Sequence, residues 1–480
     1  MILIVFGICV VGFPIVLLFL CIMWLVARDS RDICLPSGPT PPVIRGWIPF
    51  VGCGLKFVKN PRAYLEVCRK TYGDTFILYL FGIKLFCLFS QEGLSYLYQV
   101  RESDASFTEA TKGLLGLKIP KELTSDSTVS MFHRGLKKQL LEGYLEHMND
   151  ATVETLRCLH KKGRFEVFSF MKQLIHKIGF LCWVGREAAQ PENLEKFVVN
   201  FEKLDPEQGF KDLGALLWTI LTNKWVEKKA LDNIERVLQN IWDQRQMKGE
   251  WIPDNLSGLY DAHSDLPERK RHRRVAAEVV LFHMASQANM YAALSWTLIN
   301  LLLCRDVCMK RVLDEISNAR DCHGDQLTYN LAALDNLTFI EDVVQESLRL
   351  AQQSITLRKV MKPCQFGDYA IPPGYYLATL LSITNQQTPI DQPPADQFWP
   401  FRNLSKTNYN ISTFGHGYHA CPGQHFAMIV TKVFVVYLLT GQHSLILEPE
   451  FSDVKIPPTS VGAVARSQHP CIVRYCKTHD

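Results

Sequence analysis

A short glycine-rich stretch built around one cysteine, Phe414-Gly-His-Gly-Tyr-His-Ala-Cys-Pro-Gly423, constrains this chain more than any other feature. Its three glycines let the backbone adopt positive φ angles and pass close to a flat group. A helix that starts after Pro422 would direct its positive end toward the sulfur of Cys421. Such surroundings favour a thiolate, the form of cysteine that binds metals. The stretch therefore predicts a loop that presents a thiolate to a metal; the alternative is a buried structural cysteine in a glycine-rich turn.

Four of five residues of this loop match the haem-binding pattern of a known family, and the fifth departs from it. Phe414, Gly417, His419, Cys421 and Gly423 fall on Phe-x-x-Gly-x-Arg-x-Cys-x-Gly, so the loop resembles that of the cytochrome P450s. The resemblance implies that Cys421 is the axial ligand of the iron in haem b, an arrangement that favours cleavage of the O–O bond. His419 replaces an arginine that binds a haem propionate in most of the family. A histidine can also donate to a propionate, although its charge depends on pH.

The length and composition agree with this resemblance. For 480 residues, two domains would be the first expectation, but the resemblance implies one haem-centred unit with the mainly α P450 fold and a small β region. A hydrophobic content of 47% suits a large core with an apolar pocket, and a net charge of +4 is too small to suggest a nucleic-acid partner. The 15 cysteines lack paired Cys-x-x-Cys spacing, which predicts reduced thiols in a cytosol-facing protein.

The N-terminal segment is expected to anchor the protein in a membrane. Residues 1–27 contain no charged side chain, and a helix of that length exceeds the roughly 30 Å of hydrocarbon in a bilayer. A cleaved signal peptide is the alternative, but the apolar stretch is longer than a typical signal core. Residues 28–46 are a Pro-rich linker, and 47–480 form the catalytic domain. Arg28 and Arg31 favour a cytosolic C-terminal side, and the resemblance implies the endoplasmic reticulum membrane, crossed once.

Hydrophobic periodicity and turn residues predict the main elements. We expect a β-hairpin over 76–89 that turns at Phe81-Gly82. The other expected elements are helical, at 61–72, 153–242, 275–303 and 426–439.

Two basic clusters are open to more than one interpretation. The Trp-x-x-x-Arg motif by which P450s bind haem propionates is missing; one of His133, Arg134, Lys137 and Lys138 could replace it, or these residues form a solvated face. Arg269-Lys-Arg-His-Arg-Arg274 precedes the long apolar helix. It is either a solvated helix start, which we favour, or a docking site for an acidic electron-donating reductase.

The middle of the long helix departs from the usual P450 sequence. In Ala285-Ser-Gln-Ala-Asn289, Ala288 stands in place of the acid and Asn289 in place of the threonine that relay protons in most of the family. An amide has no titrating proton, but Asn289 could hold a water that delivers one; a core amide bonded to the backbone is the alternative. The stretch resembles the cholesterol and oxysterol 7α-hydroxylases, and prostacyclin synthase shares the asparagine. Weaker matches to the oxysterol enzymes lie at 46–49, 358–363 and 461–464.

Four charged residues are expected to support the haem site. Glu346 and Arg349 form the Glu-x-x-Arg pair of the P450s, and their i,i+3 spacing places both on one helical face. Arg402 matches the arginine of the Pro-Glu-Arg-Phe segment, although Phe401 replaces the glutamate. The resemblance thus implies a triad of Glu346, Arg349 and Arg402. Arg358 lies where P450s place a second arginine that binds a propionate.

The resemblance implies a membrane-anchored P450 monooxygenase. Such an enzyme uses O₂ and electrons that NADPH-cytochrome P450 reductase supplies, and the expected substrate is a sterol, an oxysterol or cholesterol attacked at the 7α position. An endoperoxide isomerase of the prostacyclin-synthase type is the nearest alternative. A hydroxylase of broad lipid or xenobiotic specificity and a haem-binding sensor are the others.

Overall fold

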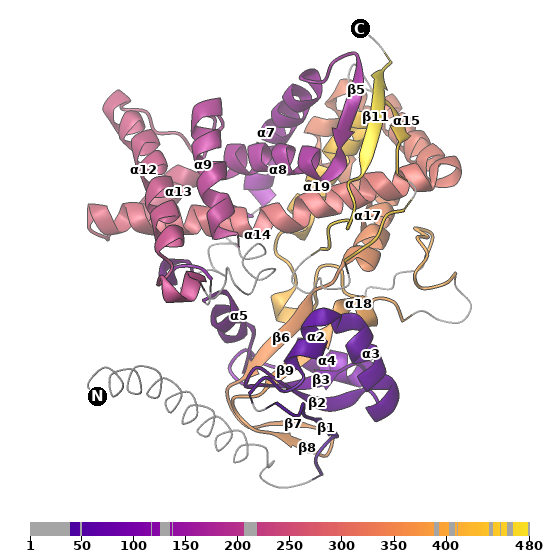
Figure 1. Cartoon of the computed structure of the whole chain (residues 1–480). Helices are drawn as coiled ribbons and strands as arrows, with labels where there is room; N and C mark the ends of the chain where they lie inside the picture. The colour runs from indigo at the N-terminus through magenta and orange to yellow at the C-terminus, as the bar shows by residue number, and fades with distance from the viewer. Residues whose placement is uncertain are drawn as a thin grey trace, which may run out of the picture. The chain divides into compact units, whose positions relative to one another are not determined.

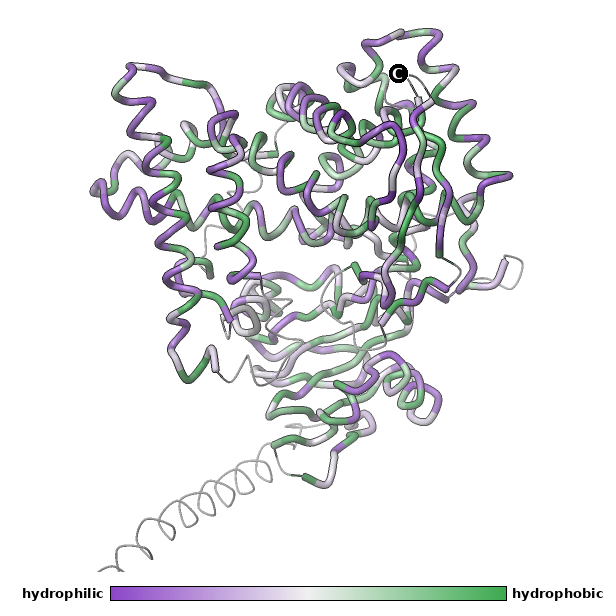
Figure 2. The backbone as a smooth tube through the Cα atoms, turned by 45° about the horizontal axis from the view of Figure 1, so that its top comes forward, coloured by the Kyte–Doolittle hydropathy of each residue, from purple (hydrophilic) through white to green (hydrophobic). Residues whose placement is uncertain are grey.

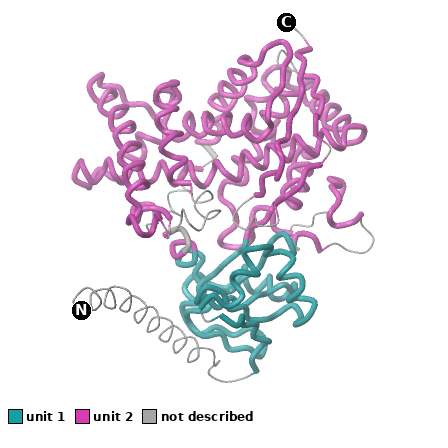
Figure 3. The backbone as a smooth tube through the Cα atoms, in the orientation of Figure 1, with its two compact units in different colours: residues 1–110, 355–384, 408–410 teal, residues 111–354, 385–407, 411–480 magenta. Residues whose placement is uncertain are grey.

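The computed structural model comprises two compact units that interleave in the sequence. It describes residues 39–48, 50–116, 118–124, 135–136, 138–205, 218–387, 393–402, 409, 411–440, 445–451, 453–457 and 464–478. Unit 1 takes its residues from 1–110, 355–384 and 408–410, and unit 2 contains the rest (Figure 3). The predicted anchor, residues 1–27, and most of the predicted linker lie outside the described residues.

Unit 1 is built on a six-stranded sheet in the order β1-β2-β3-β9-β6-β4 (Figure 1). Its strands carry mostly hydrophobic residues (Figure 2), and α2, α3, α4 and α18 complete the unit with the small β7-β8 ribbon. The strands are β1 (Val43–Ile44), β2 (Thr75–Leu80), β3 (Ile83–Leu88), β4 (Ala105–Ser106), β6 (Ile355–Val360), β7 (Cys364–Phe366), β8 (Tyr369–Ile371) and β9 (Tyr376–Leu380). The helices are α2 (Gly54–Lys59), α3 (Pro61–Tyr72), α4 (Gln91–Gln99) and α18 (Leu381–Thr384).

Two local predictions in unit 1 are confirmed. Strands β2 and β3 pair as an antiparallel hairpin, and its turn residues Phe81 and Gly82 both have positive φ angles, 48° and 75°, as a two-residue hairpin turn requires. Helix α3 starts at Pro61, where a missing N–H costs nothing. The side chain of Asn60 caps this helix by accepting from the N–H of Ala63.

Unit 2 is mainly helical and contains the long helix α14. Along the chain α5 (Phe107–Leu115) runs from unit 1 into unit 2. The other helices of unit 2 are α7 (Lys138–Arg157), α8 (Val167–Trp183), α9 (Pro191–Leu204), α12 (Trp225–Lys248), α13 (Asn255–Ala262), α14 (Glu268–Leu303), α15 (Lys310–His323), α16 (Leu331–Asp335), α17 (Thr338–Ala351) and α19 (Gln424–Leu439). Its strands β5 (Lys162–Glu166), β10 (Leu445–Pro449) and β11 (Ile472–Lys477) form a sheet in the order β10-β11-β5. The prediction of helix throughout 153–242 is wrong at β5, because that strand is stabilised by pairing with β11, which is remote in sequence.

Helix α14 lies at the centre of the core of unit 2. It has 36 residues, and almost every residue from Val275 to Leu302 is buried outside a short stretch in the middle. It packs most extensively against α8 and also contacts α17 and α12. A helix that is apolar on all sides is stable only when it is enclosed in this way. No single helix of the described ranges is long and apolar enough to cross a membrane; α14 and Arg305–Tyr329 meet the criteria only as a pair bent by 99°.

Candidate functional site

The predicted cysteine loop forms a closed turn before α19. The N–H of Cys421 donates to the carbonyl of Phe414 over 2.6 Å, which closes the loop. Gly415 and Gly417 have φ angles of 73° and 65°, which residues with a Cβ rarely adopt, so the glycines are needed for this path. The Cys421 residue itself is exposed, and it forms no disulfide. An exposed cysteine at the end of this loop fits the predicted ligand better than the buried structural cysteine of the alternative interpretation.

Two backbone amides act on the sulfur of Cys421. Hydrogen bonds from the N–H groups of Gly423 and Gln424 lower the pKa of the thiol, whereas the surrounding atoms raise it more strongly by desolvation. These amides stand at the start of α19, a helix of 16 residues, where the helix dipole favours negative charge. The loop thus supplies the donors that a metal-bound thiolate needs.

The other predicted residues of the loop differ in their surroundings. Phe414 is half-buried and packs against the core of unit 2, so it ties the loop to the helices. His419 is half-buried and meets the ring of Tyr418 edge-on, at 5.0 Å between centroids. Gly417 is exposed and begins a single 3-10 turn, Gly417–His419.

The middle of α14 carries an accessible stripe. Ala285 and Asn289, one turn apart, are exposed, and Ala288 is half-buried, whereas the residues before and after this stretch are buried. Side chains four residues apart share one face of a helix. This face is therefore open to contact by another group.

Asn289 is bonded to the C-terminal part of the chain. Its Oδ1 accepts from the N–H of Val464 over 3.1 Å, and its Nδ2 makes no hydrogen bond to another described residue. The following residues also contact α14, since the carbonyl of Ala465 accepts from Trp296 Nε1 over 2.5 Å and Arg466 lies 4.9 Å over the ring of Tyr291. The amide of Asn289 is therefore exposed and oriented by one backbone bond.

Arg358 lies on β6 of unit 1 and is almost fully buried, at 2% exposure. Its Nη1 makes no hydrogen bond and lies 3.6 Å from Glu102 Oε2. Burial lowers the pKa of this guanidinium, while the Glu102 carboxylate opposes the shift. A buried donor without an acceptor costs free energy, so this site fits an anionic group such as a haem propionate.

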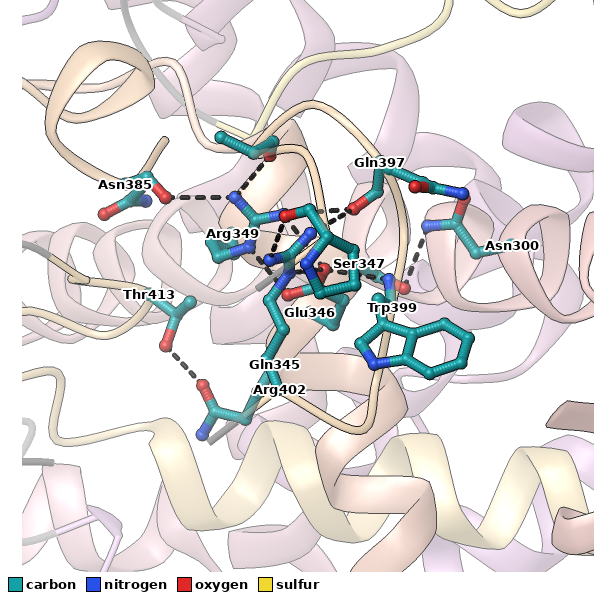
Figure 4. A network of polar contacts seen from close by, with 12 residues as sticks. Asn300, Gln345, Glu346, Ser347, Arg349, Asn385, Gln397, Trp399, Arg402 and Thr413 are labelled. Atoms are coloured by element: carbon teal, nitrogen blue, oxygen red, sulfur yellow. Dashed lines mark hydrogen bonds and ion pairs between the residues drawn. The ribbon is translucent and has the colours of Figure 1, made fainter. Parts of the chain in front are cut away.

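Glu346, Arg349 and Arg402 form one buried ion-pair cluster in unit 2 (Figure 4). Arg349 donates to both carboxylate oxygens of Glu346, over 2.6 and 2.9 Å, and Arg402 Nε donates to Oε1 over 3.0 Å. All three side chains have 0% exposure. Such bidentate, water-excluded pairing fixes geometry as well as charge.

Backbone groups complete this cluster, and sequence reasoning missed them. The N–H of Trp399 donates to Glu346 Oε1 over 2.9 Å, and both arginines donate to the carbonyl of Gln397. Further carbonyls that accept from the arginines belong to Asn385, Ala395, Pro393 and Pro394. No spacing rule in the sequence points to these carbonyls.

Phe401, which replaces the family's glutamate, takes part in an aromatic cluster instead. Its ring lies 5.2 Å from that of Phe339 and 5.0 Å from that of Trp399. The guanidinium of Arg311 lies over both Phe339 and Phe401. Apolar and cation–π contacts thus hold this position without a carboxylate.

The structure describes only one of the two basic clusters in full. His133, Arg134 and Lys137 lie outside the described residues, and Lys138 is the first residue of α7. In the second cluster the arginines at 271, 273 and 274 bind groups of their own unit: three backbone carbonyls, three carboxylates and Glu278. These three arginines therefore bind neighbouring groups at the start of α14, which the favoured interpretation of a solvated helix start did not expect, whereas Arg269 and Lys270 are exposed.

The comparisons agree with this geometry. The family model described as cytochrome P450 matches residues 41–469. Human 24-hydroxycholesterol 7-alpha-hydroxylase is 24% identical over 85% of this chain and 88% of its own length, and Bos taurus lanosterol 14-alpha demethylase is 24% identical over 92% and 89%. The structure of a retinoic-acid-bound cyanobacterial enzyme, CYP120A1, has the same fold, with a TM-score of 0.71 at 19% identity over 92% of this chain and 100% of that one.

The residues described above also suit the family's cofactor. In unit 2, the amide donors around Cys421 suit a thiolate ligand, and the accessible face of α14 suits a flat macrocycle. In unit 1, Arg358 Nη1, which makes no hydrogen bond, could donate to a propionate. With a family model that covers most of its length, the chain belongs to the cytochrome P450 family, and it is a monooxygenase that uses haem b and electrons drawn from NADPH through a redox partner.

Proposed function

We propose that this monooxygenase hydroxylates a sterol, with the 7α position of an oxysterol or cholesterol as the leading candidate. Both mammalian relatives described above are named for sterol substrates, but for different carbons, at about the same identity. The similarity therefore supports the substrate class more strongly than the carbon. The observation that carries the proposal is Asn289, which stands accessible on α14 where the sterol 7α-hydroxylases also have an asparagine.

We assign the axial ligand to Cys421 and the propionate contacts to His419 and Arg358. Phe414 supports the loop from the core. Gly417, with its positive φ angle, and Gly423, which has no side chain beside the sulfur, are proposed to allow the loop to approach the macrocycle closely. When bound, haem activates O₂ so that one oxygen atom is inserted into a C–H bond of the substrate. The amides of Gly423 and Gln424 hold the negative charge on the sulfur, which the otherwise desolvated thiol would resist.

Asn289 is proposed to position a water on the accessible face of α14. Its Oδ1 already accepts from Val464, which leaves the Nδ2 group to donate to a water oxygen. This water can then donate one of its own protons, so the water and not the amide supplies the proton. Ala288, which has neither an acid nor a hydroxyl group, leaves room for this water and takes no part in proton transfer.

The protein is proposed to be tethered to the endoplasmic reticulum membrane by residues 1–27, with a linker at 28–46 and a catalytic domain at 47–480 that faces the cytosol. The absence of charge in the first segment supports the anchor. NADPH-cytochrome P450 reductase is the proposed electron donor, because it serves enzymes anchored on this side of that membrane. Among the described arginines, those at 271, 273 and 274 are already paired within unit 2, so reductase docking through them is disfavoured.

Cys421→Ser tests the haem assignment. We expect the variant to lose the carbon-monoxide difference band typical of thiolate ligation, because an alcohol is a far weaker acid than a thiol and stays protonated. A substrate-binding difference spectrum across oxysterols, followed by product analysis with reductase and NADPH in reconstituted membranes, tests the substrate. Turnover of an endoperoxide without NADPH, together with no oxidation of any sterol, would favour the isomerase instead.

Asn289→Ala tests the mechanism. We expect hydroxylation to fall by about 10²–10⁴, the range for one positioned proton-transfer group, while substrate binding persists and NADPH oxidation yields hydrogen peroxide. Asn289→Thr should recover part of the rate. The matched control is Trp296→Phe, which removes another bond to the same C-terminal segment but leaves the amide. Equal uncoupling in both variants would reduce Asn289 to a support for residues 464–466.

A further inference from the structure

Two polar side chains outside the ion-pair triad bind the two residues that directly precede the cysteine loop. Asn385 is fully buried, with 0% exposure. Its Oδ1 accepts from the N–H of Ser412 over 2.7 Å, and its Nδ2 donates to the carbonyl of the same residue over 3.2 Å. The Asn385 side chain therefore pairs with both backbone polar groups of Ser412, as a neighbouring strand would.

Asn385 is also joined to the triad. Its backbone carbonyl accepts from Arg349 Nη1 over 3.1 Å (Figure 4). Gln345 lies one turn before Arg349 on α17, and its Oε1 accepts from the hydroxyl of Thr413 (Figure 4). Two separate sets of hydrogen bonds thus connect α17 with Ser412 and Thr413, the residues that lead into the loop.

The residues held in this way directly precede the bond that closes the loop. Phe414, next to Thr413, accepts from the N–H of Cys421 over 2.6 Å. His416 Nε2 lies 2.9 Å from the carbonyl of Ile411 and ties the turn to its own start. Because the loop is closed at Phe414, a shift of the two preceding residues moves the backbone of Cys421 with it.

We propose that Asn385 and Gln345 are positioning residues that fix the sulfur of Cys421 by connecting the buried triad to residues 412 and 413. The inference rests on the proposed role of Cys421 as the haem ligand. An asparagine suits position 385 because its short side chain carries both a donor and an acceptor. Without it, the N–H and the carbonyl of Ser412 would both lose a buried hydrogen bond, and the residues that lead into the loop would shift.

The test compares Asn385→Ala with Thr413→Val and with a matched control, Asn300→Ala. Asn300 is also a buried amide, and its Nδ2 donates to Ser347 Oγ on α17 over 3.0 Å (Figure 4), so the control loses a similar bond that does not reach the loop. The readout is the carbon-monoxide difference spectrum of the reduced haem-loaded protein, which separates thiolate-ligated from other haem. Unfolding midpoints are measured in parallel.

We expect the ratio of thiolate-ligated to other haem to fall about ten- to hundredfold in Asn385→Ala, the equivalent of losing one or two buried hydrogen bonds. Thr413→Val, which keeps the volume of the side chain, should give a smaller fall, and Asn300→Ala should keep the parental ratio. If Asn385→Ala does not fold, the comparison of Thr413→Val with Asn300→Ala decides. Parental ratios in the loop variants, or an equal fall in the control, would overturn the inference. A parent protein without the thiolate band would instead refute the role of Cys421.

Discussion

Neutralising Glu346 is expected to cost much more stability than neutralising the carboxylate of an exposed ion pair. Its carboxylate is the common partner of Arg349 and Arg402, and all three side chains have 0% exposure. Removing one partner of a buried ion pair costs about 3–5 kcal/mol, since the other charge stays buried. Glu346→Gln leaves two buried guanidinium groups without their carboxylate. Their backbone carbonyl acceptors remain, so we expect the free energy of unfolding to fall by about 3–5 kcal/mol and not by twice that value.

Glu448→Gln is the control for this change. Glu448 pairs with Arg474 over 2.6 Å in the same unit, but both side chains are more than half exposed, at 52% and 57%. Because water screens an exposed pair, this variant should lose about 1 kcal/mol or less. Urea unfolding of the haem-loaded protein in detergent, followed by tryptophan fluorescence, gives both values. A loss in Glu346→Gln no larger than that in Glu448→Gln would refute the argument from burial.

Three further predictions concern acid stability, haem retention and membrane orientation. Burial lowers the pKa of His176 to about 3 and also lowers that of His283. Below about pH 6.5 the unfolded chain therefore takes up protons that the folded protein does not, and the free energy of unfolding falls by about 1.4 kcal/mol per pH unit for each histidine. His176→Gln should reduce this pH dependence by the contribution of one histidine, as measured by unfolding from pH 7 to 4. Arg358→Leu should speed haem transfer to apomyoglobin about tenfold, as expected for the loss of one charge-assisted bond; an unchanged rate would exclude the propionate contact. Asn336 is exposed in an Asn-x-Thr sequence and should stay unglycosylated on the cytosolic side, so endoglycosidase-sensitive mass at this residue would contradict the orientation.

Features that depend on neighbouring residues could be predicted from the sequence. The Phe81-Gly82 turn and the proline start of α3 follow from backbone preferences that act over a few residues. The strand β5 could not be predicted in this way and was wrongly assigned to a helical region. It pairs with β11, more than 300 residues away, for example Glu166 with Ile472, and such distant pairing outweighs local propensity.

The sequence by itself determined the family and the position of the cysteine loop, because the spacing of glycines around Cys421 is a local requirement of backbone conformation. It also pointed to Asn289, but not to its partner Val464, 175 residues later. Only the tertiary structure decided that partner, the exposure of Asn289 within a buried helix, and the pairing of Asn385 with Ser412. The physical reason is that a buried polar group must be satisfied by whichever group the packing brings near, and packing joins segments whose order in the chain carries no record of their contact.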